Sequence, residues 1–289
     1  MKYLALATLI LSSPLWARTE GPRVSYQWRD LAELKSASDE LKGSKASFEQ
    51  FHSVLVAPIW KKQLLLIHNY NMRYNRFKNI DNWQYNEIHS QSVHKLGLVY
   101  YHKEIGGFTP LIFYSHSRDA KFTFDKPLHT YAFGGRIKSS FLNSFIGAPK
   151  VSALSLLLRI RQFPNTNKYT PIVRQEFSWH HQRFLLLFPG EFRHTYILED
   201  KREVYYALRL TDKNVFPFEY GPIKGWNTEG NTMAILAGYE IEIFKPLNFA
   251  VELGVQTESV DMRDTNNNSI RSYETAPAPW GKIRLVSIF

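Results

Sequence analysis

The stretch Thr232–Ile243 (TMAILAGYEIEI) alternates between two kinds of side chain. Its odd-numbered positions are all apolar or aromatic, whereas Thr232, Glu240 and Glu242 occupy even-numbered positions. Successive side chains of a β-strand point to opposite faces of the sheet. The stretch therefore predicts a strand with one apolar face and one polar face.

The same two-sided pattern recurs along most of the chain after Lys45, and no segment there has a convincing helical period. The clearest further runs are 63–74, 151–163, 202–211 and 248–257. Less regular runs cover 48–59, 92–103, 108–117, 129–141, 172–179, 183–197 and 280–289. Together they predict an all-β protein of about twelve strands, within a range of about ten to fourteen.

The composition excludes several other classes of protein. Of the 289 residues, 44% are hydrophobic and 15% aromatic, and none is cysteine. The apolar fraction is too high for a disordered chain. No apolar run approaches the roughly 20 residues that a membrane-spanning helix needs. The absence of cysteine excludes disulfide frameworks, thiolate metal sites and cysteine nucleophiles.

Strand length and loop length favour a membrane barrel over a soluble sheet protein. Several runs have the roughly nine to eleven residues that cross a bilayer at barrel tilt. Tight turns at 106–107 and 245–247 contrast with long polar segments at 75–88, 211–231 and 258–278. We therefore predict a closed antiparallel transmembrane β-barrel with short periplasmic turns and longer outer loops. A soluble, secreted β-sandwich that binds a ligand is the alternative, since its strands would also alternate.

The N-terminus has the features of a secretory signal peptide. Lys2 precedes the apolar segment Tyr3–Leu11, and Ala17 offers a small residue at a cleavage site. The apolar segment is too short to anchor the chain in a bilayer. We predict a signal peptide at 1–17, an N-terminal arm or plug at 18–45, and the barrel at 46–289.

The last strand resembles the C-terminal signal of Gram-negative outer-membrane β-barrel proteins. Phe289 ends the chain, and Leu285 and Ile283 continue the apolar alternation, whereas Ser287 departs from it. This resemblance implies export through the inner membrane and insertion into the outer membrane by the barrel assembly machinery. It also implies migration on gels that changes on heating. Separately, the excess of Lys and Arg outside the lumen predicts contact with outer-membrane lipids and lipopolysaccharide.

The enzymes of this class suggest a second interpretation, a lipid-modifying hydrolase or acyltransferase. The nearest match to their paired His and Ser is the segment Ser115-His116-Ser117-Arg118-Asp119. Neighbouring residues of a strand lie on opposite faces, so His116 is poorly placed to activate Ser115 or Ser117. We therefore predict no catalytic residue.

Metal and cofactor sites also lack the expected spacing. Neither His180-His181 nor the pair His89 and His94 has a nearby carboxylate at ligand spacing. Asp261, Asp264 and the asparagines 266–268 lack the glycine turn and distal Glu of a calcium loop. We predict neither metal nor cofactor.

Charged residues on the polar faces predict what fills the barrel. The residues that we place in the lumen are Arg159, Arg161, Arg174, Glu176, Glu203, Arg209, Glu240, Glu242, Glu252, Lys282 and Arg284. Their charges nearly balance, which predicts an interlocked salt-bridge network, since buried charges must be paired. The formal charge of +10 therefore lies largely elsewhere, where it suits anionic lipid headgroups. Dispersed basic residues and export disfavour nucleic-acid binding. We predict a structural barrel or a narrow channel for small solutes.

Overall fold

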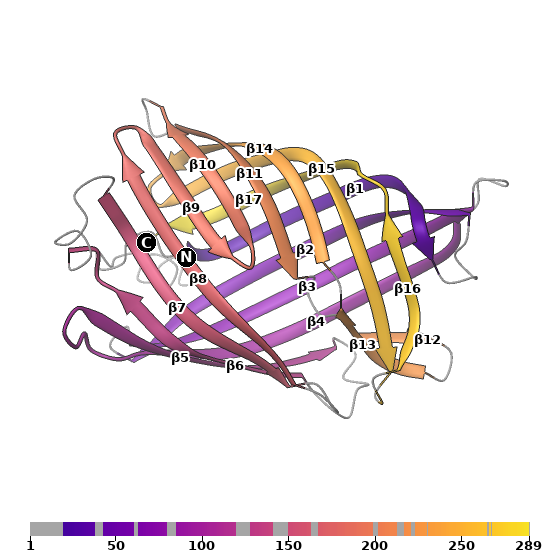
Figure 1. Ribbon diagram of the computed structural model, residues 1–289, viewed down its shortest axis with the longest axis horizontal. Helices are drawn as coiled ribbons and strands as arrows, with labels where there is room; N and C mark the ends of the chain where they lie inside the picture. The colour runs from indigo at the N-terminus through magenta and orange to yellow at the C-terminus, as the bar shows by residue number, and fades with distance from the viewer. Residues whose placement is uncertain are drawn as a thin grey trace, which may run out of the picture.

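Strands that follow one another along the chain pair antiparallel, and the last strand returns to pair with the first (Figure 1). This computed structural model describes residues 20–37, 43–60, 63–79, 85–119, 128–140, 150–162, 167–198, 202–212, 217–220, 223–229, 231–264, 266 and 268–288. The predicted signal peptide lies outside them, as does Phe289. None of the described residues forms a helix that could cross a membrane. The prediction of an all-β closed antiparallel barrel is confirmed.

The strands are long over most of the barrel. In chain order they are β1 (Glu20–Ala37), β2 (Ser44–Trp60), β3 (Leu64–Asn79), β4 (Tyr85–Tyr101), β5 (Phe108–Asp119), β6 (Leu128–Ile137), β7 (Lys150–Gln162), β8 (Asn167–Trp179), β9 (Gln182–Phe188), β10 (Glu191–Ile197), β11 (Arg202–Asp212), β12 (Pro217–Tyr220), β13 (Ile223–Glu229), β14 (Asn231–Phe244), β15 (Leu247–Asp264), β16 (Ser269–Thr275) and β17 (Ala278–Ile288). The short ones are β9, β10, β12, β13 and β16.

Fourteen strands make the ring and one lies outside it, so the predicted number of about twelve was wrong. β13 continues into β14 and β16 into β17, so each of these pairs counts as one strand of the ring. The short β12 pairs with β13. Glu20 pairs with Ile288, so both termini of the described chain lie at one end of the barrel. We call this the terminal end and the opposite one the distal end.

Two local errors account for the missing strands. Residues 18–45, which we expected to form an arm or plug, contribute β1 to the wall, where it pairs with β2 and β17. Its run from Val24 to Trp28 alternates like any wall strand, with Val24 exposed and Ser25 buried. The run 183–197, which we took as one strand, is the hairpin of β9 and β10, because Pro189 and Gly190 form a tight turn.

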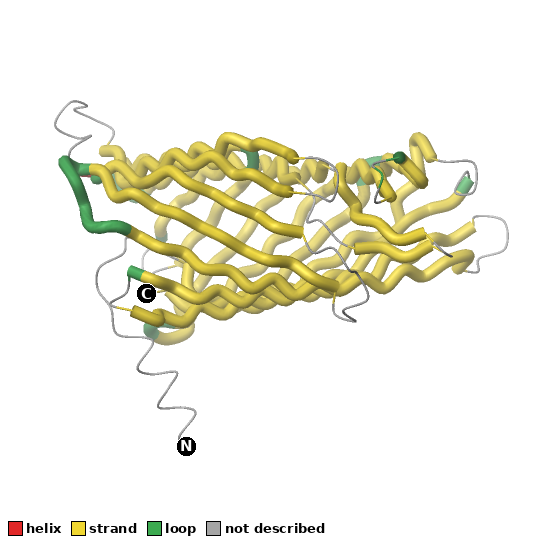
Figure 2. Tube along the Cα trace, turned by 90° about the horizontal axis from the view of Figure 1, so that it is seen from below, coloured by secondary structure: helices red, strands yellow, loops and turns green. Residues whose placement is uncertain are grey.

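The predicted long loops are largely strands. β3 extends to Asn79, and β4 already begins at Tyr85. β15 and β16 cover most of 258–278. The outer faces of these extensions are polar, and their inner faces mix apolar residues such as Val260 with polar ones such as Glu258. They therefore lack the apolar outer face that marks the other strands. In Figure 2 the strands run at a tilt around a long cylinder, as closure into a barrel requires.

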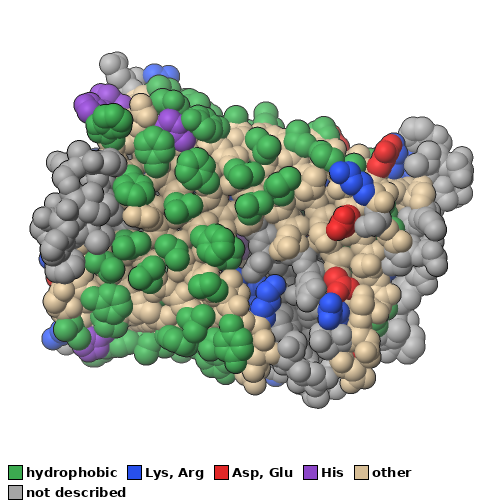
Figure 3. All heavy atoms as spheres, in the orientation of Figure 1, with side chains coloured by type: hydrophobic (Ala, Val, Ile, Leu, Met, Phe, Trp, Pro, Cys, Tyr) green, Lys and Arg blue, Asp and Glu red, His purple; other side chains and the backbone are tan. Residues whose placement is uncertain are grey.

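Apolar side chains cover the outer face towards the terminal end. Large hydrophobic residues point outward from most strands; Leu55, Leu98, Phe133, Ile235 and Leu253 are each at least 40% exposed. On the face drawn in Figure 3, hydrophobic side chains cover one part of the barrel, and charged side chains gather nearer the distal end. Within the described chain these residues do not pack against a second sheet, as a soluble sandwich would require.

The interior of the distal end is packed with apolar side chains. Ala46, Phe77, Val260, Met262 and Tyr273 form this distal core, and each is at most 2% exposed. The rings of Phe77 on β3 and Tyr273 on β16 meet edge to face with centroids 5.4 Å apart. These two strands are separated in the ring by β2 and β1. The wall therefore curls so tightly here that side chains of non-adjacent strands fill the interior.

Candidate functional site

The structure places the predicted lumen residues on the inner face of the wall. Residues directly opposite one another on paired strands share a face. Arg159 lies opposite Ala132 and Arg161 opposite Thr130, both of which are buried. Glu203, Glu240, Glu252 and Arg284 are themselves buried.

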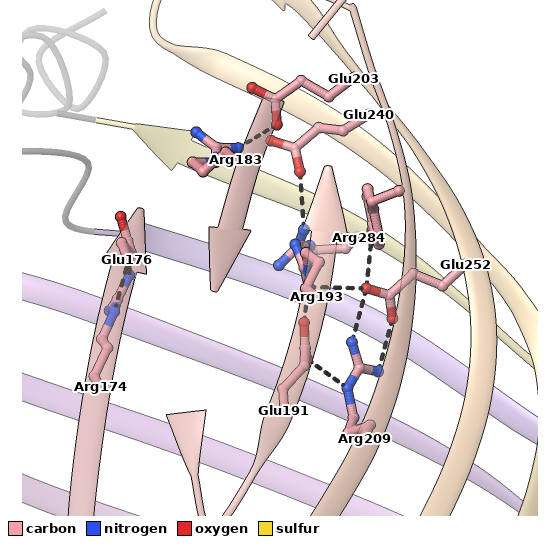
Figure 4. Close-up of polar contacts among 11 residues, drawn as sticks. Arg174, Glu176, Arg183, Glu191, Arg193, Glu203, Arg209, Glu240, Glu252 and Arg284 are labelled. Carbon is pink, nitrogen blue, oxygen red and sulfur yellow. Dashed lines mark hydrogen bonds and ion pairs between the residues drawn. The ribbon is translucent and has the colours of Figure 1, made fainter. Parts of the chain in front are cut away.

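Glu252 is the centre of the principal charge cluster (Figure 4). Its two carboxylate oxygens accept hydrogen bonds from Nη1 and Nη2 of Arg209 at 2.9 and 3.0 Å. Nε of Arg209 donates to Glu191 at 2.8 Å, and Arg193 binds the other oxygen of Glu191 at 2.5 Å. Arg193 also lies 3.7 Å from Glu252. Bidentate pairing of this kind fixes both partners in orientation as well as position.

Tyr205 completes the cluster on the side of β11. Its hydroxyl donates to Glu252 at 2.9 Å, and the guanidinium of Arg193 lies 4.2 Å from its ring centroid. Gly238 on β14 faces this ring, and a Cβ there would lie 2.2 Å from Cζ of Tyr205. The tyrosine therefore reaches Glu252 because its neighbour in the sheet has no side chain.

A second pair extends the cluster towards the terminal end. Nη2 of Arg284 on β17 donates to Glu240 on β14 at 3.0 Å. The other oxygen of Glu240 accepts a bond from Asn248 at 2.7 Å. The side chain of Glu240 thus joins three strands, β14, β15 and β17.

Two further ion pairs form at β8 to β11. Arg174 and Glu176, two positions apart on β8, bind at 2.5 Å. Arg183 on β9 binds Glu203 on β11 across the lumen-facing side of β10. Most of the predicted lumen residues are thus paired, either with one another or with residues that the sequence analysis did not select.

Arg159 and Arg161 lie elsewhere in the lumen. They face Lys95 on β4, which packs its ammonium 5.5 Å from the ring centroid of Phe113. Glu242 lies near the terminal end of β14, opposite Asn248.

An interior cavity of about 480 Å³ adjoins the Glu252 cluster. Among the described residues, its lining has seven cationic side chains and a single carboxylate, Glu191. The cationic residues are Arg23, Arg73, Arg174, Arg193, Arg209, Lys282 and Arg284. The sequence predicted a near balance of charge, but Glu252 and Glu240 lie behind the cations that they bind and do not line the cavity. The surface that a solute would meet is therefore cationic.

A buried triad separates this cavity from the distal core. Glu258 on β15 accepts bonds from Arg73 at 2.6 and 2.7 Å and from Arg29 at 3.0 Å. Arg29 also donates to Thr275 at 3.1 Å. Both guanidinium groups lie over the ring of Phe48, at 4.0 Å for Arg73 and 5.1 Å for Arg29. The triad therefore ties β1, β3 and β15 across the lumen.

Three features of the lumen were not predicted from the sequence: Glu191, Arg193 and the Glu258 triad. Glu191 and Arg193 are two positions apart, which places them on one face of a strand, and the Pro189-Gly190 turn marks where that strand begins. Glu258 was hidden because its segment was interpreted as a loop. Nothing in the sequence pairs it with Arg29, since the residues are brought together only by closure of the ring.

The structure separates the candidate catalytic pair. Ser115 and Ser117 are buried on the inner face, at 0% and 5% exposed, whereas His116 points outward and accepts a hydrogen bond from Arg118 at 2.9 Å. His116 therefore lies across the wall from both hydroxyls. This is the arrangement that alternation predicted.

The carboxylates of Asp261 and Asp264, at the turn between β15 and β16, accept hydrogen bonds from nearby residues. Asp264 accepts bonds from the backbone N–H groups of Asn268 and Asn266, both at 2.8 Å. The bond from Asn268 is the main reason that the pKa of Asp264 lies below its usual value. Asp261 accepts from Arg263 and Ser269. Among the described residues no group of three His, Asp or Glu could hold a metal ion.

No protein-family model and no curated protein sequence matches the chain. Three solved structures are similar over almost its whole length. An outer membrane channel from Pseudomonas putida F1 aligns with a TM-score of 0.44 and 9% identity, over 96% of this chain and 100% of that one. The transport unit of the autotransporter AIDA-I from Escherichia coli gives 0.39 and 12%, over 99% and 97%. The outer membrane protease OmpT from Escherichia coli gives 0.24 and 9%, over 96% and 100%.

Proposed function

We propose that the protein lies in the outer membrane of a Gram-negative bacterium and acts as a narrow channel for small anionic solutes. The observation that carries this proposal is the cavity lining, where seven cationic side chains accompany one carboxylate among the described residues. A surface of one sign inside low-dielectric walls concentrates ions of the opposite sign. The cavity volume of about 480 Å³ suits a small solute.

The apolar part of the outer face supports the membrane location. Side chains such as Ile235, Leu253 and Leu55, which are 67%, 57% and 57% exposed, would be costly to leave in water in such number. A bilayer would cover them, and the strands of the ring pair with neighbours on both sides over most of their length. We assign the terminal end to the periplasm, because it carries the two-residue turns between β8 and β9 and between β14 and β15.

The distal core supports a narrow passage. Phe77 and Tyr273 fill the interior between the cavity and the distal end, where a wide pore would instead hold water. Solute flow past this core needs either a path beside it or movement of its side chains. The proposed conduit is therefore small and selective, with the cationic cavity as its binding chamber.

Cysteine scanning of β9 tests which face meets lipid, and the chain has no native cysteine to interfere. Leu186 is 41% exposed on the outer face, whereas its neighbour Leu187 lines the cavity. In protein inserted into lipid vesicles, we expect Leu187→Cys to react with an anionic methanethiosulfonate reagent and Leu186→Cys to resist it. Comparable reaction rates at the two positions would contradict the membrane location.

Conductance in planar bilayers tests the channel. We expect the refolded protein to conduct with a preference for anions, and Lys282→Gln to reduce the anion-to-cation permeability ratio, because Lys282 lines the cavity. Lys103→Gln is the matched control, since Lys103 is exposed near the β4–β5 turn. The reversal potential in a salt gradient gives the ratio. Absence of conductance at any voltage would leave a structural barrel, and cation preference would overturn the role of the lining.

A further inference from the structure

Outward-facing histidines gather in one place on the barrel wall, across β3 to β6. The histidine row, as we call it, consists of His68, His94, His116, Arg118 and His129. These side chains belong to the outer face, because each alternates with residues of the inner face. Ser115 and Ser117 on β5 and Thr130 on β6 are buried examples of those inner residues.

Strand pairing brings the row together from four strands. His94 lies directly opposite Arg118, and His116 opposite His129. The rings of His68 and His94 stack with centroids 5.4 Å apart, and those of His116 and His129 meet edge to face at 5.3 Å. The row is thus one continuous patch, although its members are scattered along the sequence from position 68 to position 129.

Hydrogen bonds within the row orient its members and leave donor capacity. Nε of Arg118 donates to Nε2 of His116 at 2.9 Å, while Nε2 of His68 and Nδ1 of His94 lie 3.2 Å apart. Nδ1 of His129 lies 3.0 Å from the hydroxyl of Tyr114. A guanidinium group has five N–H donors, and the bond to His116 uses one of them. Within the described chain, the two terminal amino groups of Arg118 are left for another partner.

The row marks a boundary on the outer face. Towards the terminal end, the outward residues of the same strands are apolar, as at Leu98, Ile112 and Phe133. Towards the distal end, β3 presents Arg76, which binds Glu49 on the outside of the wall at 2.5 Å. From the terminal end to the distal end, the outer face thus changes from apolar side chains to histidine and tyrosine and then to charged ones. This order matches the change from acyl chains to headgroups to water.

We propose that the histidine row binds the phosphate of a phosphorylated glycolipid in the distal leaflet, of the lipopolysaccharide type. The geometry points to phosphate because a guanidinium group and several imidazoles lie side by side, between the apolar part of the outer face and its charged distal part. Arginine pairs with phosphate through two parallel hydrogen bonds, and histidine adds donors without the cost of a permanent charge beside lipid. This inference rests on the proposed membrane location.

The test measures thermal unfolding of the refolded protein in detergent, with three additives: diphosphoryl lipid A, lipid A without phosphate, and inorganic phosphate. We expect only diphosphoryl lipid A to raise the unfolding temperature at micromolar concentration, since binding to the native state stabilises it. In Arg118→Gln we expect the concentration needed for half of that shift to rise about tenfold, the usual effect of losing one charged hydrogen bond. Arg202→Gln is the matched control, because Arg202 is exposed at the start of β11.

The outcomes separate this inference from the proposed location. An equal response to phosphate-free lipid A, or a response to inorganic phosphate alone, would overturn the assignment of a lipid phosphate. An unchanged concentration dependence in Arg118→Gln would overturn the histidine row as the site. A parent protein whose gel migration does not change on heating would contradict the membrane location itself, whereas a heat-modifiable protein that ignores lipid A contradicts only the row.

Discussion

Replacing Glu252 by glutamine is expected to lower the free energy of unfolding by about 3–5 kcal/mol, the cost of leaving a buried charge without its partner. Glu252 is 0% exposed, and it receives both terminal amino groups of Arg209 as well as the hydroxyl of Tyr205. Without its charge, Arg209 would retain only Glu191, which also serves Arg193. The measurement is urea unfolding in lipid vesicles, followed by tryptophan fluorescence.

The chain offers an internal comparison for this loss. Glu49 and Arg76 bind on the outer face, where both side chains are 35% exposed. Glu49→Gln should cost at most about 1 kcal/mol, as for other exposed pairs. Equal losses in the two variants would show that the Glu252 cluster is not a desolvated site. The double variant Glu252→Leu with Arg209→Met should regain part of the stability, because it removes both charges and leaves Glu191 with Arg193.

Replacing Phe77 by alanine is expected to destabilise the protein by about 3–5 kcal/mol and to raise its conductance. Phe77 is 0% exposed in the distal core and meets Tyr273 at 5.4 Å between ring centroids. Removal of the ring leaves a cavity between the cationic chamber and the distal end. If the core limits flow, single-channel current at a given voltage should increase.

Phe133→Ala is the control for this effect. Phe133 is 48% exposed on the outer face of β6, so its loss changes contact with lipid and not the interior. We expect its conductance to equal that of the parent. A Phe77→Ala protein that is destabilised but conducts like the parent would show that solutes do not pass through the distal core.

The sequence predicts the barrel where one face of a strand is apolar, and it fails where that asymmetry ends. Thr232–Ile243 was correctly interpreted as a strand because its outward residues are apolar and several of its inward residues are polar. The distal extensions around Glu258 and Ser272 are polar on the outside and were interpreted as loops. The hairpin at Pro189 was lost for a different reason, because two short strands with the same polarity pattern resemble one long strand.

The sequence predicts which charged residues lie in the lumen, but it does not predict which of them pair with one another. Alternation alone is enough to place Arg209, Glu240 and Glu252 in the lumen. Which carboxylate binds which arginine depends on strand order, stagger and closure, and the Arg29–Glu258 contact spans 229 positions of sequence. The same holds for the histidine row, whose members look unrelated along the chain because four strands must pair to assemble them.

The short hairpin of β9 and β10 is a less rigid part of the wall than the long strands. Each of these strands has seven residues, against 18 in β1 and 17 in β2. Fewer backbone hydrogen bonds hold them, so local fraying requires less free energy here than along the long strands. Glu191 and Arg193, which help to hold Arg209 and Glu252, are carried by this hairpin. Local opening of this hairpin would therefore move Glu191 and Arg193 and change the charge distribution at the cavity wall.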